Sequence, residues 1–158
     1  MLRLLTAALA LILLPVAAHA DWAPTKWGMS PEQVVAAVPG AVAMAHREGT
    51  VVLKHHKLAI ASVRDGAFDV DASFYFEPRK RALAFIQFVP APEKCDAYLD
   101  QIVARHGKGK RQDKGLGAGT MILIDWTDPA TKERLSFTGV KGSNRASIYC
   151  HFMQQVPA

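Results

Sequence analysis

The stretch DGAFDVDASFYF (residues 65–76) is typical of a β-hairpin, and the fold prediction starts from it. Its first two residues, Asp65-Gly66, form a pair that tight two-residue hairpin turns prefer. After the turn, apolar and mostly polar residues alternate, as in a strand with one buried face. The apolar positions are Phe68, Val70, Ala72, Phe74 and Phe76. The sequence therefore predicts a strand whose phenylalanine-rich side packs on a core.

The residues around this hairpin extend it into a helix followed by three strands. Strand-like segments precede it at residues 58–63 and follow it at residues 82–89. Upstream, Ser30 and Gln33 have the spacing of a capping box, which predicts the start of a short helix. Residues 27–89 therefore form a first predicted unit.

The same order of elements recurs in the second half of the chain. A pattern of helical spacing follows Pro90 and ends at Gly107, and three strand-like segments come after it. These segments are residues 121–126, 134–138 and 146–153. We therefore predict an α+β fold of two helix–three-strand units, residues 27–89 and 90–153. In this prediction the units share one antiparallel sheet, and both helices pack on one face of it.

The segment HGKGKRQDKGLGAG (residues 106–119) is rich in glycine and in basic residues. This composition predicts a mobile surface loop. A phosphate-binding loop is the alternative, but the glycine and lysine spacing does not match one, and the segment follows a helix instead of a strand.

Residues 1–20 have the pattern of a secretory signal peptide. Arg3 is followed by an apolar run, and the segment closes with the small residues Ala18 and Ala20 around His19. The alternative, a membrane-spanning helix, is disfavoured because Pro15 interrupts a run that is already short for a bilayer. We predict cleavage between Ala20 and Asp21, and a periplasmic or secreted protein. Because Asp21 is not a cysteine, the sequence does not indicate a lipid anchor.

The remaining residues, 21–158, suit a single domain. Loss of Arg3 leaves 18 lysine and arginine residues against 14 aspartate and glutamate residues, a net charge of +4. A mild basic excess in an exported chain does not predict nucleic acid as a partner. Attraction to an anionic lipid or glycan stays open, since a clustered basic patch is enough for it.

The two cysteines, Cys95 and Cys150, both lie in the part that remains after cleavage. An even number of cysteines in an oxidising compartment predicts a disulfide. A metal site or a pair of catalytic thiols is the alternative, but no CxxC spacing supports it.

The run WGMSPEQV (residues 27–34), followed by a short helix and a meander ending in FYF (residues 74–76), resembles small exported bacterial proteins of the β-lactamase-inhibitor-protein-like fold. The small lipoprotein subunit of the outer-membrane β-barrel assembly machinery is similar in architecture and opens with a comparable G-M-S/T-x-x-x-V pattern. The resemblance implies this fold for most of the exported chain. It carries over no functional residue, because the lipid-acceptor cysteine is missing and no segment matches an inhibitory loop.

No catalytic, metal or cofactor residues are predicted. His46, His55 and His56 lack a zinc-binding spacing, and adjacent residues on a strand point to opposite sides. Asp69 and Asp71 share a strand face, but this is the side expected to meet solvent.

We therefore predict a non-catalytic envelope protein that binds another envelope protein or a small ligand. The alternative is a small hydrolase or metal-dependent enzyme whose site forms only in three dimensions. The candidate interaction surface comprises Tyr75, Tyr149, Met153 and Trp22. Two arrangements stay open: the sheet face that bears the tyrosines is exposed, or loops and the N-terminal arm with Trp22 cover it.

Overall fold

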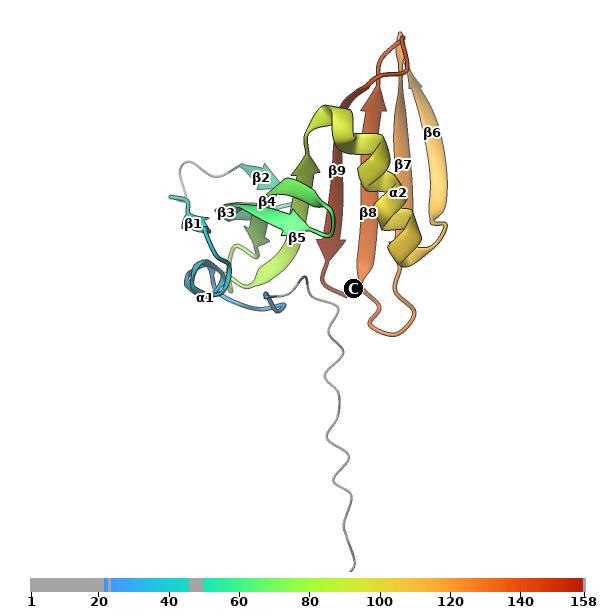
Figure 1. Ribbon diagram of the computed structural model, residues 1–158. Coiled ribbons are helices and arrows are strands. Elements are labelled where there is room, and N and C mark those ends of the chain that lie inside the picture. Colours follow the sequence, from blue (N-terminus) through green and yellow to red (C-terminus); the bar gives the residue numbers. More distant parts are fainter. Residues whose placement is uncertain (1–21, 23, 46–49, 158) are drawn as a thin grey trace, which may run out of the picture.

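The computed structural model describes residues 22, 24–45 and 50–157 as one antiparallel sheet with two short helices (Figure 1). The strand order is β1-β3-β4-β5-β9-β8-β7-β6, and β2 also pairs with β3. The helices are α1 (Pro31–Ala37) and α2 (Cys95–His106), and a short 3-10 helix, η1 (Pro92–Lys94), precedes α2. The strands are β1 (Val42–Ala43), β2 (Val51–Val52), β3 (His55–Asp65), β4 (Phe68–Phe76), β5 (Leu83–Pro90), β6 (Lys110–Leu116), β7 (Gly119–Thr127), β8 (Arg134–Lys141) and β9 (Ser147–Gln155). In these described ranges, no helix is both long and apolar enough to cross a lipid bilayer. The predicted cleavage site at Ala20 and Asp21 lies outside the described residues.

The predicted α+β fold of two helix–three-strand units is wrong, because strands dominate the described chain. Helix α1 has 7 residues and α2 has 12, whereas strand β3 alone has 11. Residues 41–56, which have no clear hydrophobic period, contribute β1 and β2, and the second half holds four strands instead of three. The chain is therefore a mainly antiparallel β protein that carries two short helices.

The basic segment that was expected to be a mobile loop contains strand β6. This strand pairs with β7 from Lys110↔Asp125 to Leu116↔Gly119, so Gly117 and Ala118 form a two-residue hairpin turn. Gly117 has a φ of 60°, which favours glycine at that position. All seven residues of β6 are exposed. With no buried face, the strand lacks the alternation of apolar and polar residues by which a half-buried strand is detected.

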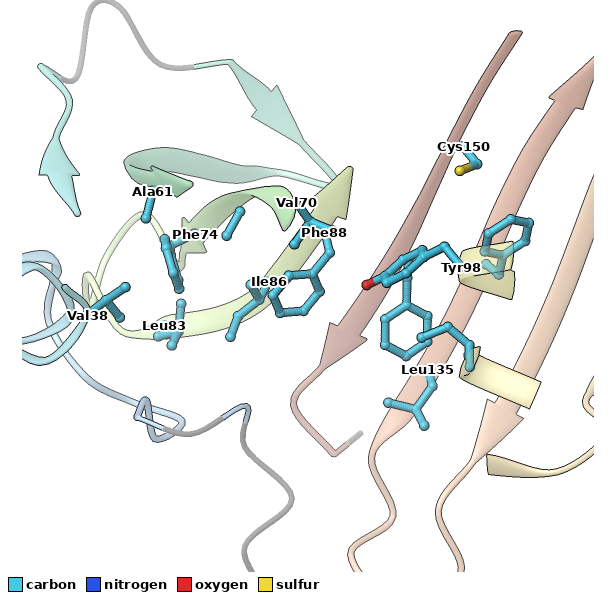
Figure 2. Packing of buried hydrophobic residues seen from close by; sticks show 14 of the residues in the cluster. Val38, Ala61, Val70, Phe74, Leu83, Ile86, Phe88, Tyr98, Leu135 and Cys150 are labelled. Carbon is cyan, nitrogen blue, oxygen red and sulfur yellow. The ribbon is translucent and has the colours of Figure 1, made fainter. Parts of the chain in front are cut away.

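Both helices lie on the same face of the sheet, and the hydrophobic core fills the space between them and the strands (Figure 2). Val38, at the end of α1, and Tyr98, on α2, are each at most 1% exposed. They join a cluster that contains Phe74 on β4 and Leu135 on β8. The helices and the apolar sides of the strands therefore share one core.

The two halves of the sheet meet at β5 and β9. Strand β5 pairs with β4 along its length and, through Phe85–Phe88, with Phe152–Gln155 of β9. In Figure 1, β3 and β4 run in a different direction from β7 and β8, and β5 curves between the two groups. The sheet is thus continuous but strongly twisted, as is usual for antiparallel sheets.

The predicted disulfide between Cys95 and Cys150 is confirmed. The two Cα atoms are 5.8 Å apart, within the usual range for this bond, and both residues are at most 1% exposed. Cys95 is the first residue of α2 and Cys150 lies in β9. The bond therefore attaches the start of α2 to the core side of the sheet.

A second attachment joins α2 to the tip of the predicted hairpin, where Asp65 is 4% exposed. The Asp65 carboxylate accepts hydrogen bonds from the Tyr98 hydroxyl at 2.7 Å and from Arg105 Nη1 at 3.0 Å. Gln101 donates to the Asp65 carbonyl at 3.0 Å and accepts from the amide of Ala67 at 2.8 Å. The hairpin of the first half is thus fixed by polar contacts to the helix of the second half.

Candidate functional site

The face of the sheet opposite the helices, called the open face below, carries one row of side chains that runs from edge to edge. The members of the row are neighbours in the strand register, and their chain neighbours Phe74, Phe88 and Phe152 point into the core on the other face. The row consists of Val42, Ile60, Ser73, Gln87, Met153, Ser136, Asp125 and Lys110. It joins an apolar end at β1 to a charged end at β6.

At the β1 end of the open face, two aliphatic side chains are accessible to solvent. Val42 is 60% exposed and Ile60 is 38% exposed. They border a hollow of about 360 Å³ whose polar walls include Ser62, Asp71 and Ser73. This end therefore offers a shallow depression with both apolar and hydrogen-bonding groups.

A larger apolar group, called the open-face patch, covers β7, β8 and β9. Met121 lies opposite Val140, and Val140 lies opposite Tyr149, in one row of the register. Tyr149 is 39% exposed, and the other members are partly buried. The patch comprises Met121, Leu123, Val140, Tyr149 and Met153. An apolar group of this kind on the solvent side of a sheet is typical of an interaction surface.

Of the four residues predicted for the interaction surface, the structure brings two together with access to solvent. Tyr149 and Met153 both belong to the open-face patch. Tyr75 is on the same face but is only 3% exposed, because its ring stacks on Phe85 with centroids 4.2 Å apart. Tyr75 therefore packs beneath the accessible residues of the open face and presents almost no area to a partner.

Trp22 lies on the opposite face of the sheet from these residues. Its ring is 5.6 Å from that of Phe88 and 6.3 Å from that of Phe74, and both phenylalanines belong to the core. Trp22 therefore packs against the core and lies away from the open-face patch.

The sequence prediction missed Met121, Leu123 and Val140 as members of the surface. The alternation in residues 121–126 already separates Met121 and Leu123 from the buried side, so the signal for these two was available. Val140 lies beyond the predicted strand at residues 134–138, whereas β8 continues to Lys141. Its membership depends on that longer strand.

Hydrogen bonds connect the two tyrosines of the open face through one glutamine. The Tyr75 hydroxyl donates to Gln87 Oε1 at 3.1 Å, and Gln87 Nε2 donates to the Tyr149 hydroxyl at 3.4 Å. Burial raises the pKa of both tyrosines, and the nearby Tyr149 raises that of Tyr75 further. Both hydroxyls are therefore neutral at physiological pH and act as hydrogen-bonding groups.

His151 lies next to Tyr149, with ring centroids 5.5 Å apart. Its Nδ1 atom is buried and has no hydrogen-bond partner among the described residues. Burial lowers the pKa of His151 to about 4, from an ordinary value of 6.5. The ring is therefore neutral at pH 7, and protonating it in the folded state is unfavourable.

Acidification should destabilise the wild-type protein more than a His151→Leu variant. The unfolded chain takes up a proton near pH 6.5 and the folded chain only near pH 4, so stability is lost as the pH falls between these values. From pH 7 to pH 4.5, urea unfolding should show an additional loss of about 2 kcal/mol in the wild type. Parallel stability curves for the two proteins would contradict this role of His151.

The residues considered for catalysis have other partners in the structure. Asp69 pairs with Arg64 at 3.0 Å, and Asp71 accepts a hydrogen bond from Ser62 at 3.0 Å. His55 lies edge-on to Phe85, with ring centroids 5.5 Å apart. Within the described ranges, no three histidine, cysteine, aspartate or glutamate side chains gather where a metal ion could bind. His46 lies outside those ranges.

Comparison with protein-family models, with curated proteins and with solved structures finds no match for this chain.

Proposed function

We propose that this chain is a non-catalytic protein of the bacterial envelope, periplasmic or secreted, and that it binds another envelope protein through the open-face patch. The observation that carries the proposal is the one-sided construction of the sheet. Both helices, the disulfide and Trp22 lie on the core side, and in the described part of the chain no helix packs on Met121, Val140 or Tyr149. A solvent-facing sheet side is usually polar, so an apolar group there favours a binding surface.

Export is supported by two independent features. The sequence of residues 1–20 has the charge, the apolar run and the closing small residues of a signal peptide. The Cys95–Cys150 disulfide is of the kind that persists in oxidising compartments. The resemblance to the β-lactamase-inhibitor-protein-like group is consistent with this location and stays a prediction.

The double variant Tyr149→Ser/Met153→Ser should lose most of the protein that the wild type captures from a periplasmic extract. The two substitutions remove accessible apolar area from the centre of the patch, where a partner would be desolvated. Quantitative mass spectrometry of captured proteins measures the loss. Since neither side chain is fully buried, the melting temperature should change by only a few degrees.

Val51→Ser is the matched control for this experiment. Val51 is an aliphatic residue that is 55% exposed, and it lies on β2, which pairs with β3 several strands away from the open-face patch. The control should capture the same proteins as the wild type. Equal capture by all three proteins, or equal loss in the control, would reject the open-face patch as the binding surface.

A further inference from the structure

We propose that the outer edge of β6 binds an extended acidic segment of the partner protein, which joins the sheet as an additional antiparallel strand. The inference rests on the proposed function, because it concerns how a protein partner is held beside the open-face patch. Strand β6 is the last in the strand order, and it forms the outer edge of the sheet beside β7 (Figure 1). Addition of a strand to such an edge is a common mode of peptide recognition.

The register shows which backbone groups of β6 are available at this edge. In a two-residue hairpin the residues that flank the turn, here Leu116 and Gly119, exchange hydrogen bonds, and bonded pairs then alternate along the strands. The amide and carbonyl groups of Arg111, Asp113 and Gly115 therefore point away from β7. Three alternating residues with outward backbone groups form a template for one more strand.

The side chains of β6 determine the charge of the segment that fits. Arg111 and Asp113 neutralise each other through two hydrogen bonds, at 2.8 and 3.0 Å. Lys110 and Lys114 are on the other side of the strand, which is the open face, and neither forms an ion pair with another described residue. Asp125 lies opposite Lys110, whereas Lys114 lies opposite the apolar Met121. The open-face side of β6 thus remains positive.

A second copy of this chain is a poor occupant of the edge. Two β6 strands brought together would both carry a positive net charge, and lysine on an edge strand opposes this kind of self-pairing. A partner strand with two carboxylates four residues apart places both on the open-face side, opposite Lys110 and Lys114. Opposite charges at directly paired positions stabilise a sheet by about 0.2–1 kcal/mol per pair.

Such a strand would also extend the open-face patch. Leu123 and Met121 of the patch lie on β7, directly opposite Gln112 and Lys114 of β6. A partner that holds β6 by its backbone would therefore place the rest of its surface over the patch. Because the edge of β6 and the open-face patch are adjacent, one extended protein segment can contact both, whereas a small anion can contact only the lysines.

The test uses the nine-residue peptide Thr-Val-Glu-Val-Thr-Val-Glu-Val-Thr. The protein is the isotope-labelled domain of residues 21–158, which lacks only the predicted signal peptide. Nuclear magnetic resonance titration should shift the amides of Arg111, Asp113 and Gly115 most. A peptide methylated at alternate backbone nitrogens cannot form the edge hydrogen bonds and should not bind. A peptide with its glutamates three residues apart, and therefore on opposite sides, should bind more weakly.

Charge-reversal variants complete the test. Lys110→Glu/Lys114→Glu should weaken peptide binding by roughly tenfold or more, because two attractive pairs become repulsive. Lys26→Glu/Lys80→Glu makes the same change in net charge at two exposed lysines outside β6 and should leave the affinity within about threefold of the wild type.

Several outcomes would overturn the inference. They are no binding at about 1 mM peptide, equal binding of the methylated peptide, and equal weakening in both charge variants. Binding to vesicles of anionic phospholipid that depends on Lys110 and Lys114, without peptide binding, would instead assign the edge to a membrane. If Tyr149→Ser/Met153→Ser abolishes capture of the partner while Lys110→Glu/Lys114→Glu does not, the proposed function stands and only the role of β6 is lost.

Discussion

A variant with both Cys95 and Cys150 replaced by alanine will unfold with a free energy about 4 kcal/mol below that of the wild type. The bond spans a sequence separation of 55 residues, so its loss returns considerable conformational freedom to the unfolded chain. For a domain of this size, the loss corresponds to a fall in melting temperature of about 15 °C. Calorimetry of the oxidised wild type and the variant measures the difference.

Reductant separates the effect of the bond from that of the substitutions. Dithiothreitol should lower the melting temperature of the wild type toward that of the variant and leave the variant unchanged. Peptide mapping without reduction should recover the two cysteines as one linked pair. Two free thiols in exported protein, or a variant as stable as the wild type, would contradict a stabilising disulfide.

The second large effect is expected from Asp65→Ala, which should destabilise the fold by about 3 kcal/mol. The substitution leaves the buried hydroxyl of Tyr98 without its acceptor, and it removes the partner of Arg105. The Arg105 side chain is 37% exposed, so water can solvate its guanidinium once Asp65 is removed. The expected destabilisation is therefore at the low end of the range for a broken buried ion pair. Chemical denaturation monitored by tryptophan fluorescence measures the change.

Asp69→Ala is the matched control, since Asp69 lies on the same hairpin and also pairs with an arginine. That pair is exposed on both sides, with side-chain exposures of 63% for Arg64 and 82% for Asp69, so its loss should cost less than about 1 kcal/mol. Adding Tyr98→Phe to Asp65→Ala should recover part of the stability, because no hydroxyl then remains unsatisfied. Equal effects of the two aspartate substitutions would show that burial of Asp65 is unimportant.

Features set by neighbouring residues could be predicted from the sequence. The hairpin predicted at Asp65-Gly66 is present, but its two turn residues are Gly66 and Ala67, because Asp65 pairs with Phe68. The capping box at Ser30 and the two faces of residues 121–126 appear where local patterns place them. The disulfide could also be predicted, because the chain has two cysteines and a leader typical of export. In each case the signal lies within a few neighbouring residues or, for the disulfide, in the number of cysteines.

Features set by distant residues could not be predicted in this way. Tyr75 is buried because Phe85 of another strand stacks on it, and alternation within β4 alone assigns Tyr75 to the solvent side. Trp22 reaches the core through contacts with Phe74 and Phe88, which no local pattern encodes. Strand β6 depends only on pairing with β7, since it buries no side chain. The number of strands, and with it the fold class, was therefore misjudged.

The pairing of β5 with β9 has a consequence for the order in which the chain can fold. During synthesis, β3, β4 and β5 emerge early and can pair with one another, but β9 is the last strand to appear. Until then, the second edge of β5 has no partner strand, and Phe88 lacks its ring contact with Phe152 of β9. Pairing across so many intervening residues is slow, and an uncovered apolar edge favours aggregation. During synthesis, the first half of the sheet therefore keeps an unpaired edge on β5 until β9 has been made.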